Sequence, residues 1–302
     1  MATKQILCVG HLVYDIRDYV NSFPQPDKSV FMRMPSQFGP GGSAANVAMN
    51  CVKLGHTAGL ISNVGADMHG KFLINELRAR GVDKREVKQI KSGRTGLSII
   101  LIDSQGQVMV IEDPGCVDAP RKISPKPFSN SNWVHMTGCT HSWLEQASSY
   151  AHKAGVPLSF DPGRAAARMG IEKLSRVIER VDFLVLNRKE LAALSGSGSA
   201  LEVKDLAREF NCTVVLKTGH GPAVVSQDGK STYEVPPFNA KKVVDTLGAG
   251  DAFASGLICG KLEGRSTYES VKMAHACAAA KVMHAGAQGM PKKAAVKKEF
   301  SF

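Results

Sequence analysis

Short apolar runs alternate with segments of helical periodicity along most of the chain. The runs are bounded by turn residues, as expected of strands that are buried on both faces of a sheet. They predict strands at residues 6–9, 58–63, 133–136, 157–160, 183–186, 213–216 and 223–226. Apolar residues with a period near 3.6 predict helices at residues 44–54, 70–80, 143–154, 171–180, 189–194, 252–260 and 266–283. This alternation predicts an α/β fold with a mostly parallel central sheet.

Two regions, residues 13–38 and 95–116, break the alternation and are predicted to be β-rich insertions. In the second region, residues 98–103 and 108–112 flank a short polar turn that contains Gly106, which predicts a hairpin. The two insertions form either a small separate sheet or an extension of the central sheet. Because no long linker or repeat divides the chain, we expect one domain over residues 1–302.

Composition is that of an ordinary globular protein, with 43% hydrophobic and 22% charged residues. No apolar run is long enough for a transmembrane helix, and the first apolar run is too short for a secretion signal. The seven cysteines are scattered without a C-x-x-C pair, which favours buried reduced thiols over a zinc site. These features predict a cytoplasmic protein that does not contact a membrane.

The net charge of +11 allows two interpretations. One is a nucleic-acid-binding protein, and the other is a basic enzyme that attracts anionic nucleotides. The basic residues are spread along the chain, aromatic residues total only 6%, and none interleave with the basic clusters. The sequence therefore favours the enzyme and predicts no nucleic-acid partner.

The segment DTLGAGDAF, residues 245–253, carries the clearest chemical signal. Gly248, Ala249 and Gly250 leave backbone N–H groups uncovered where a helix is predicted to begin, and a helix N-terminus binds anions. Asp251 would repel a phosphate there, but it could take a proton from a hydroxyl that attacks the phosphate. Read locally, the segment is either such a phosphoryl-transfer site or a glycine turn followed by an ordinary Asp near a helix start.

A second small-residue loop, GPGGSAANVA at residues 39–48, opens another predicted helix. In this order and at this separation, the two loops resemble the two signatures of the ribokinase-like (PfkB) family of carbohydrate and nucleoside kinases. The resemblance covers nearly the whole chain and is closest in pattern to archaeal-type nucleoside kinases. It also includes GHLVYD at residues 10–15, FPQP at 23–26, NRKE at 187–190 and KTGHG at 217–221.

The resemblance implies a three-layer α/β/α domain in which the two insertions form a small β-sheet lid over the acceptor. It implies that Asp251 is the catalytic base and that Gly248, Ala249 and Gly250 form the anion hole. Asp245 would orient this loop, and in some relatives the corresponding position helps hold a monovalent cation.

The resemblance also assigns the two substrates. The acceptor would be bound by Asp15, Gly41, Gly42 and Asn46. The donor ATP would be bound by Asn187, Lys217, Thr218, Gly219, Gly221 and His275, with residues 286–289 near the adenine. Asn187 and Glu190 would hold Mg²⁺, through water, although the same spacing also fits a helix capping box.

The acceptor remains open between a ribonucleoside, a free sugar and a phosphorylated sugar. Arg164 and Arg168 would favour the phosphorylated sugar if they faced the cleft, because Arg binds phosphate with a forked pair of hydrogen bonds. Relatives often pair through the lid, which implies a homodimer. A non-catalytic ligand-binding homologue is disfavoured, because Asp251 and the three small residues before it are all present.

Overall fold

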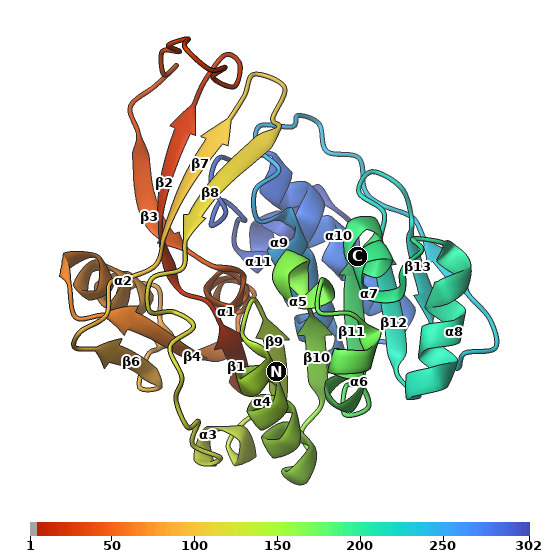
Figure 1. The fold of residues 1–302 in the computed structure, drawn as a ribbon. Helices are drawn as coiled ribbons and strands as arrows, with labels where there is room; N and C mark the ends of the chain where they lie inside the picture. The colour runs from red at the N-terminus through yellow and green to blue at the C-terminus, as the bar shows by residue number, and fades with distance from the viewer. Residues whose placement is uncertain (1–4) are drawn as a thin grey trace.

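The computed structural model describes residues 5–302. A large central β-sheet lies at the middle of the fold (Figure 1). It has ten strands in the order β14-β13-β12-β11-β10-β9-β1-β4-β5, with β6 paired to β4. All pairs are parallel except those of β13 and β14. The strands are β1 Gln5–Gly10, β4 Thr57–Gly65, β5 Val82–Asp83, β6 Val87–Ile90, β9 Trp133–Thr137, β10 Leu158–Asp161, β11 Phe183–Asn187, β12 Thr213–Lys217, β13 Ala223–Ser226 and β14 Tyr233–Val235.

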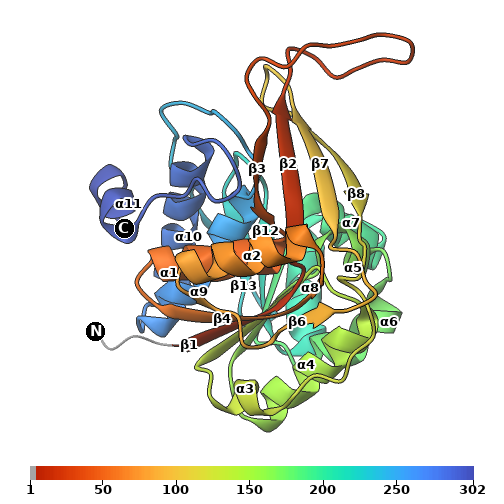
Figure 2. The same cartoon turned by 90° about the vertical axis from the view of Figure 1, so that its left-hand side faces the viewer.

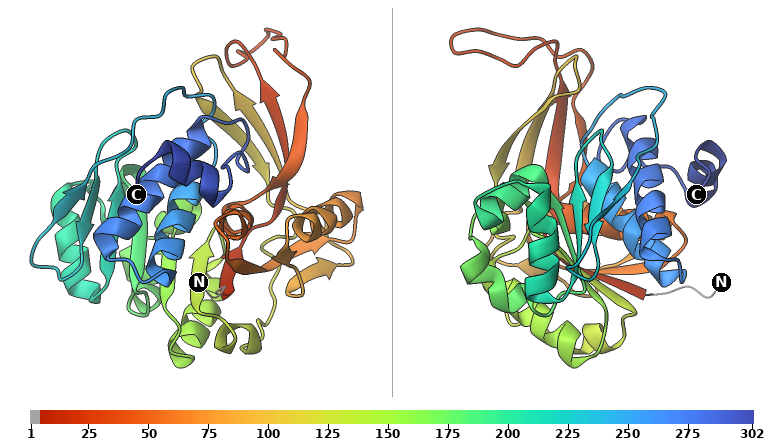
Figure 3. Two further views of the ribbon diagram at one scale, coloured as in Figure 1. Left: turned by 180° about the vertical axis from the view of Figure 1, so that it is seen from behind. Right: turned by 90° about the vertical axis from the view of Figure 1, so that its right-hand side faces the viewer.

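Helices cover both faces of this sheet, and each face has its own hydrophobic cluster (Figure 3). One layer consists of α1 Ser43–Lys53, α2 Met68–Ala79, α9 Ala249–Leu262, α10 Thr267–Val282 and α11 Lys293–Glu299. The other consists of α3 Lys126–Ser129, α4 His141–Lys153, α5 Gly163–Ala167, α6 Ile171–Ile178, α7 Arg188–Ser195 and α8 Ala200–Phe210. The predicted three-layer α/β/α fold is therefore confirmed.

The two insertions form a separate four-stranded sheet in the order β3-β2-β7-β8. Its strands are β2 Val13–Tyr19, β3 Gln37–Gly41, β7 Leu97–Ile102 and β8 Val108–Asp113. β7 and β8 pair antiparallel, which confirms the predicted hairpin. The small sheet rises from the carboxyl end of β1 and projects away from the central sheet (Figure 2). It thus stands beside the edge at which parallel α/β proteins bind ligands.

All seven predicted strands and all seven predicted helices are present, with ends that differ by a few residues. The sequence analysis did not predict α8, although its buried residues Val203, Leu206, Ala207 and Phe210 follow the helical period. Shorter elements, including α3, α5, α11, β5, β6 and β14, were also not predicted. All seven cysteines are free and buried. None of the helices in residues 5–302 is both long and apolar enough to cross a bilayer.

Candidate active site

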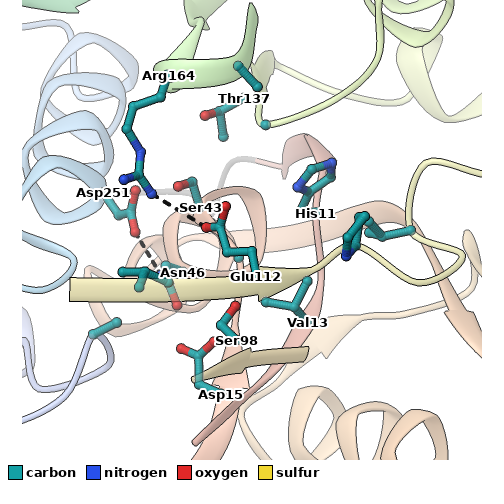
Figure 4. Close-up of a pocket in the computed structure, with 18 of the residues that line it drawn as sticks. His11, Val13, Asp15, Ser43, Asn46, Ser98, Glu112, Thr137, Arg164 and Asp251 are labelled. Carbon is teal, nitrogen blue, oxygen red and sulfur yellow. Dashed lines mark hydrogen bonds and ion pairs between the residues drawn. The ribbon is translucent and has the colours of Figure 1, made fainter. Parts of the chain in front are cut away.

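A cleft of about 640 Å³ lies between the carboxyl edge of the central sheet and the small sheet. Segments far apart in the sequence line it: strands β2, β7 and β8, and the N-termini of α1 and α9 (Figure 4). Among the predicted residues it brings together Asp15, Gly42, Asn46, Gly248, Gly250 and Asp251. Both glycine signatures thus meet at one site, although they lie about 200 residues apart in the chain.

The N-terminus of α9 forms the floor of the cleft. Gly248 precedes the helix with φ of 77°, and a Cβ at this position would lie 2.8 Å from Cα of Ala287. Only glycine therefore fits both the backbone conformation and the close approach of residues 286–289. The helix begins at Ala249 and runs for 14 residues, so its positive dipole end faces the cleft. The N–H group of Ala249 donates a hydrogen bond of 3.2 Å to the main-chain carbonyl of Thr246.

Asp251 stands in that first turn and faces Asn46 of α1. The Asn46 side-chain amide donates a hydrogen bond of 2.7 Å to Oδ2 of Asp251 (Figure 4). Burial raises the pKa of Asp251 to about 6, and the negative charge of Asp161 adds to this, whereas the hydrogen bond from Asn46 opposes it. A carboxylate with a pKa in this range is ionised at neutral pH and still basic enough to accept a proton.

Gln288 fixes the orientation of Asn46. The Gln288 side-chain NH₂ donates hydrogen bonds of 2.7 Å to Oδ1 of Asn46 and 2.6 Å to the main-chain carbonyl of Pro40. The Gln288 side-chain oxygen accepts a hydrogen bond of 3.0 Å from the guanidinium of Arg17. The Asn46 carbonyl oxygen is thereby occupied, so its NH₂ group points to Asp251. The sequence analysis missed Arg17 and this role of Gln288, and placed the loop of Gln288 only near the adenine.

Asp15 of β2 lies in the cleft beneath the glycine loop. A Cβ on Gly41 would fall within its carboxylate, so the glycine allows the carboxylate to lie against the backbone. The Asp15 side chain is almost fully buried, and burial raises its pKa to about 7, against the lowering effects of Arg17 and a hydrogen bond from Ser98. Next to it, Gly42 caps α1 with φ of 91°, a conformation that favours glycine.

Ionisable side chains from several segments line the mouth of the cleft. Arg164, just after β10, lies 3.5 Å from Glu112 of β8 (Figure 4). Arg168 also lines the cleft, so neither arginine is confined to the outer face of its helix. On the opposite wall, His11 and Asp118 form a 2.8 Å contact. Glu112 and Asp118 carried no signal in the sequence that distinguished them from ordinary surface carboxylates.

The residues predicted to bind nucleotide lie beside this cleft and do not line it. Lys217 ends β12 and forms a 2.6 Å ion pair with Asp161 at the end of β10. Its ammonium would be 3.6 Å from a Cβ on Gly250, so the cation lies next to the anion-hole loop. Thr218 donates 2.8 Å to the carbonyl of Pro222, which closes the turn that contains Gly219 and Gly221.

Asn187 and Glu190 form a complete capping box at the start of α7. Asn187 Oδ1 accepts a hydrogen bond of 2.9 Å from the main-chain N–H of Glu190. Glu190 Oε2 accepts one of 2.8 Å from the main-chain N–H of Asn187. Burial raises the pKa of Glu190, and the nearby charge of Asp161 adds to this effect. In residues 5–302, no three His, Cys, Asp or Glu side chains gather to hold a metal directly.

His275 lies within α10 and is only 7% exposed. Its ring packs edge-on against Phe253 at 5.2 Å, and burial lowers its pKa to about 4. It does not line the cleft. The structure therefore places this residue in the core between α9 and α10, where a neutral imidazole packs as an aromatic ring.

The comparisons with known proteins cover nearly the whole chain. Residues 3–294 match the model of the pfkB family carbohydrate kinases. The chain is 34% identical over 295 residues to an ATP-dependent ribose-1-phosphate kinase of Halopiger xanaduensis, covering 97% of this chain and 96% of that protein. It is 26% identical to a nucleoside kinase of Methanocaldococcus jannaschii, covering 86% and 84%.

Among solved structures, the Arabidopsis thaliana ribokinase complexed with ribose and ATP superposes with a TM-score of 0.86 at 26% identity, covering all of both chains. The fold, the two glycine loops and the family match agree. The chain belongs to the pfkB family of carbohydrate kinases.

Proposed function

We propose that this protein transfers the γ-phosphate of ATP to a hydroxyl group of a sugar or nucleoside, with Asp251 as the catalytic base. The observation that carries the proposal is the position of Asp251. It is a half-buried, ionisable carboxylate in the first turn of α9, in the same cleft as Asp15. A base next to a helix N-terminus suits a hydroxyl that attacks a bound phosphate.

In this reaction Asp251 accepts the proton of the acceptor hydroxyl while that oxygen bonds to the γ-phosphorus. The bond between the γ-phosphorus and the bridging oxygen breaks, and ADP leaves. The N–H groups of Gly248, Ala249 and Gly250 stabilise the charge on the transferred group. The N–H group of Ala249 must first release its 3.2 Å hydrogen bond to the carbonyl of Thr246. Asp15 accepts hydrogen bonds from the acceptor's hydroxyls, and Gly41 and Gly42 let the backbone approach it.

The donor side is formed by Lys217, Thr218, Gly219 and Gly221, with Asn187 and Glu190 beside them. Mg²⁺, when bound there with the nucleotide, neutralises phosphate charge, and its usual preference for few carboxylates plus phosphate oxygens fits Glu190. Lys217 supplies a fixed positive charge next to the anion hole. The small sheet acts as a lid that keeps water from competing as acceptor.

A ribosyl compound is the acceptor that we favour, since relatives are named nucleoside kinase and ribokinase. A sugar phosphate is the second candidate, and a specific observation favours it. Arg164 and Arg168 both line the cleft, where they could hold a phosphate group. The relative at 34% identity is named a ribose-1-phosphate kinase.

Two further features support pairing into a homodimer and a cytoplasmic location. The segment between β2 and β3 exposes large apolar side chains, among them Phe31, Met32 and Met34, with Phe31 88% exposed. Such a patch at the tip of the lid suits pairing with a second copy. The seven free thiols suit a reducing, cytoplasmic location.

The test is a screen for ADP formation with MgATP over ribonucleosides, free pentoses and hexoses, and sugar phosphates, with the product identified by mass. Asp251→Asn is measured in parallel, and Asp228→Asn, an exposed carboxylate outside the cleft, is the control. Turnover on one class that disappears only in Asp251→Asn supports the proposal. Turnover that survives in Asp251→Asn contradicts the role of this residue. If sugar phosphates are used, Arg164→Ala and Arg168→Ala should raise their KM and spare free sugars.

A further inference from the structure

Lys281, in the last turn of α10, is completely buried, with no exposed side-chain area. A buried ammonium is costly unless hydrogen bonds and an opposite charge compensate it. Its Nζ donates 2.8 Å to the main-chain carbonyl of Asp245 and lies 3.7 Å from Oδ1 of the same residue. Burial lowers the pKa of Lys281 to about 8, and Asp245 opposes this, so the ammonium form dominates at pH 7.

The carboxylate of Asp245, which lies beside Lys281, accepts three further hydrogen bonds from groups around the anion hole. Its Oδ1 accepts 2.7 Å from the amide of Leu247, one residue before Gly248. Its Oδ2 accepts 2.7 Å from the amide of Gly286 and 3.2 Å from the hydroxyl of Tyr19 on lid strand β2. Asp245 is itself fully buried. The position of the anion-hole loop thus depends on this carboxylate staying in place.

Family resemblance associates the position of Asp245 with a monovalent cation, so the fit of such an ion can be tested here. The oxygens that a K⁺ ion would use include the carbonyl and carboxylate of Asp245. In this chain the carbonyl already accepts a hydrogen bond from an ammonium, and the carboxylate lies beside the same charge. A second cation next to Lys281 would be repelled and would lack these ligands. The residues present therefore do not fit a metal ion.

We infer that the ammonium of Lys281 is a built-in cation that positions the anion-hole loop through Asp245 and makes the kinase independent of monovalent metal ions. Lys281 is a positioning residue, since it acts on the reacting groups only through Asp245. The inference rests on the proposed function for its activity measurement only, and its stability measurement needs no substrate.

The experiment compares the protein in KCl, NH₄Cl and tetramethylammonium chloride at equal ionic strength. Tetramethylammonium is too large to enter a buried site. The wild-type melting temperature and kcat should be the same in all three salts. Lys281→Ala, which leaves room for an ion beside Asp245, should melt several degrees lower in tetramethylammonium and regain most of this loss in K⁺ or NH₄⁺. Its kcat should fall at least tenfold and be rescued by the same ions.

Lys53→Ala is the matched control. Lys53 also donates to backbone carbonyls, those of Gln288 and Met290, but it is only partly buried, so small cations should not rescue its variant selectively. Lys281→Arg should keep the wild-type indifference to salt, with reduced stability because the larger group is overpacked.

Two results would overturn the inference. The first is a wild-type kcat that is several-fold higher in K⁺ than in tetramethylammonium, or a wild-type melting temperature that is several degrees higher. This result can be observed without any variant. The other is a Lys281→Ala protein that melts and turns over like the wild type in every salt. If no acceptor is found, the melting temperatures alone decide, so failure of the proposed function is distinguished from failure of this inference.

Discussion

Asn46 donates its side-chain amide to Asp251 at 2.7 Å, across 205 residues of sequence. This contact joins the N-termini of α1 and α9, and it exists because Gln288 already occupies the other end of the Asn46 amide. A hydrogen bond to the charged carboxylate lowers its pKa, whereas burial raises it. The opposed effects place the pKa of Asp251 at about 6, so the base is ionised at neutral pH although it is half-buried.

The pH dependence of turnover should report this carboxylate. Because Asp251 acts as a base only when ionised, kcat should fall as the pH decreases through about 6. A plot of kcat against pH between 5 and 8 measures the effect, with saturating acceptor at each pH. A kcat that stays constant down to pH 5 would contradict Asp251 as the titrating base.

Asp251→Asn should abolish turnover without destabilising the fold. We expect kcat to fall by about 10²–10⁴-fold. The folded-state pKa of Asp251 is raised, so its stabilising contribution is present at low pH and is lost as the pH rises through about 6. Removing the buried charge should therefore leave the melting temperature at pH 8 equal to the wild type or higher. A large drop in melting temperature would indicate that the lost activity reflects unfolding.

Asn46→Leu tests the hydrogen bond from Asn46 to Asp251. The leucine has a similar size and cannot donate, so the pKa of Asp251 should rise and the acid limb of kcat should move to higher pH. The measurement is the same pH profile, with the melting temperature as a check on folding. Thr140→Val, at an exposed hydroxyl outside the site, provides the comparison profile. An acid limb that does not move would mean that Asn46 does not control the base.

Gly41→Ala should disturb Asp15 selectively. The new methyl group would fall within the Asp15 carboxylate, which must then move away from the acceptor. Overpacking of this kind costs about 1–3 kcal/mol, and the KM of the acceptor should rise more than the KM of ATP. Gly198→Ala is the matched control, because its new Cβ would lie 3.3 Å from its nearest neighbour, the carbonyl of Arg188. Equal effects on both KM values would argue against an acceptor role for Asp15.

The sequence predicted most of the fold because its signals are periodic and local. Buried strands such as β1 and β9 appear as continuous apolar runs, and glycine loops mark the starts of α1 and α9. The role of Asp251 was only one of two local interpretations of its segment, and the family resemblance favoured it.

The contacts that the sequence analysis missed depend on single polar residues that meet across the fold. Gln288 reaches Asn46 from 242 residues away, and Lys281 is one lysine in an otherwise apolar helix segment. Nothing in periodicity distinguishes such residues from solvent-exposed ones. His275, which the resemblance assigns to the nucleotide, packs its ring edge-on against Phe253 at 5.2 Å, a contact that the sequence pattern did not predict.

Glu190→Gln separates the two roles assigned to Glu190. Glutamine keeps the capping box, because its side-chain oxygen can still accept from the Asn187 amide, so the melting temperature should change little. The negative charge is lost, so the Mg²⁺ concentration that gives half-maximal rate should rise severalfold at fixed ATP. Glu269→Gln, in the equivalent capping box of α10, is the matched control and should leave the Mg²⁺ dependence unchanged. If Glu190→Gln lowers the melting temperature and leaves the Mg²⁺ dependence unchanged, Glu190 is a capping residue only.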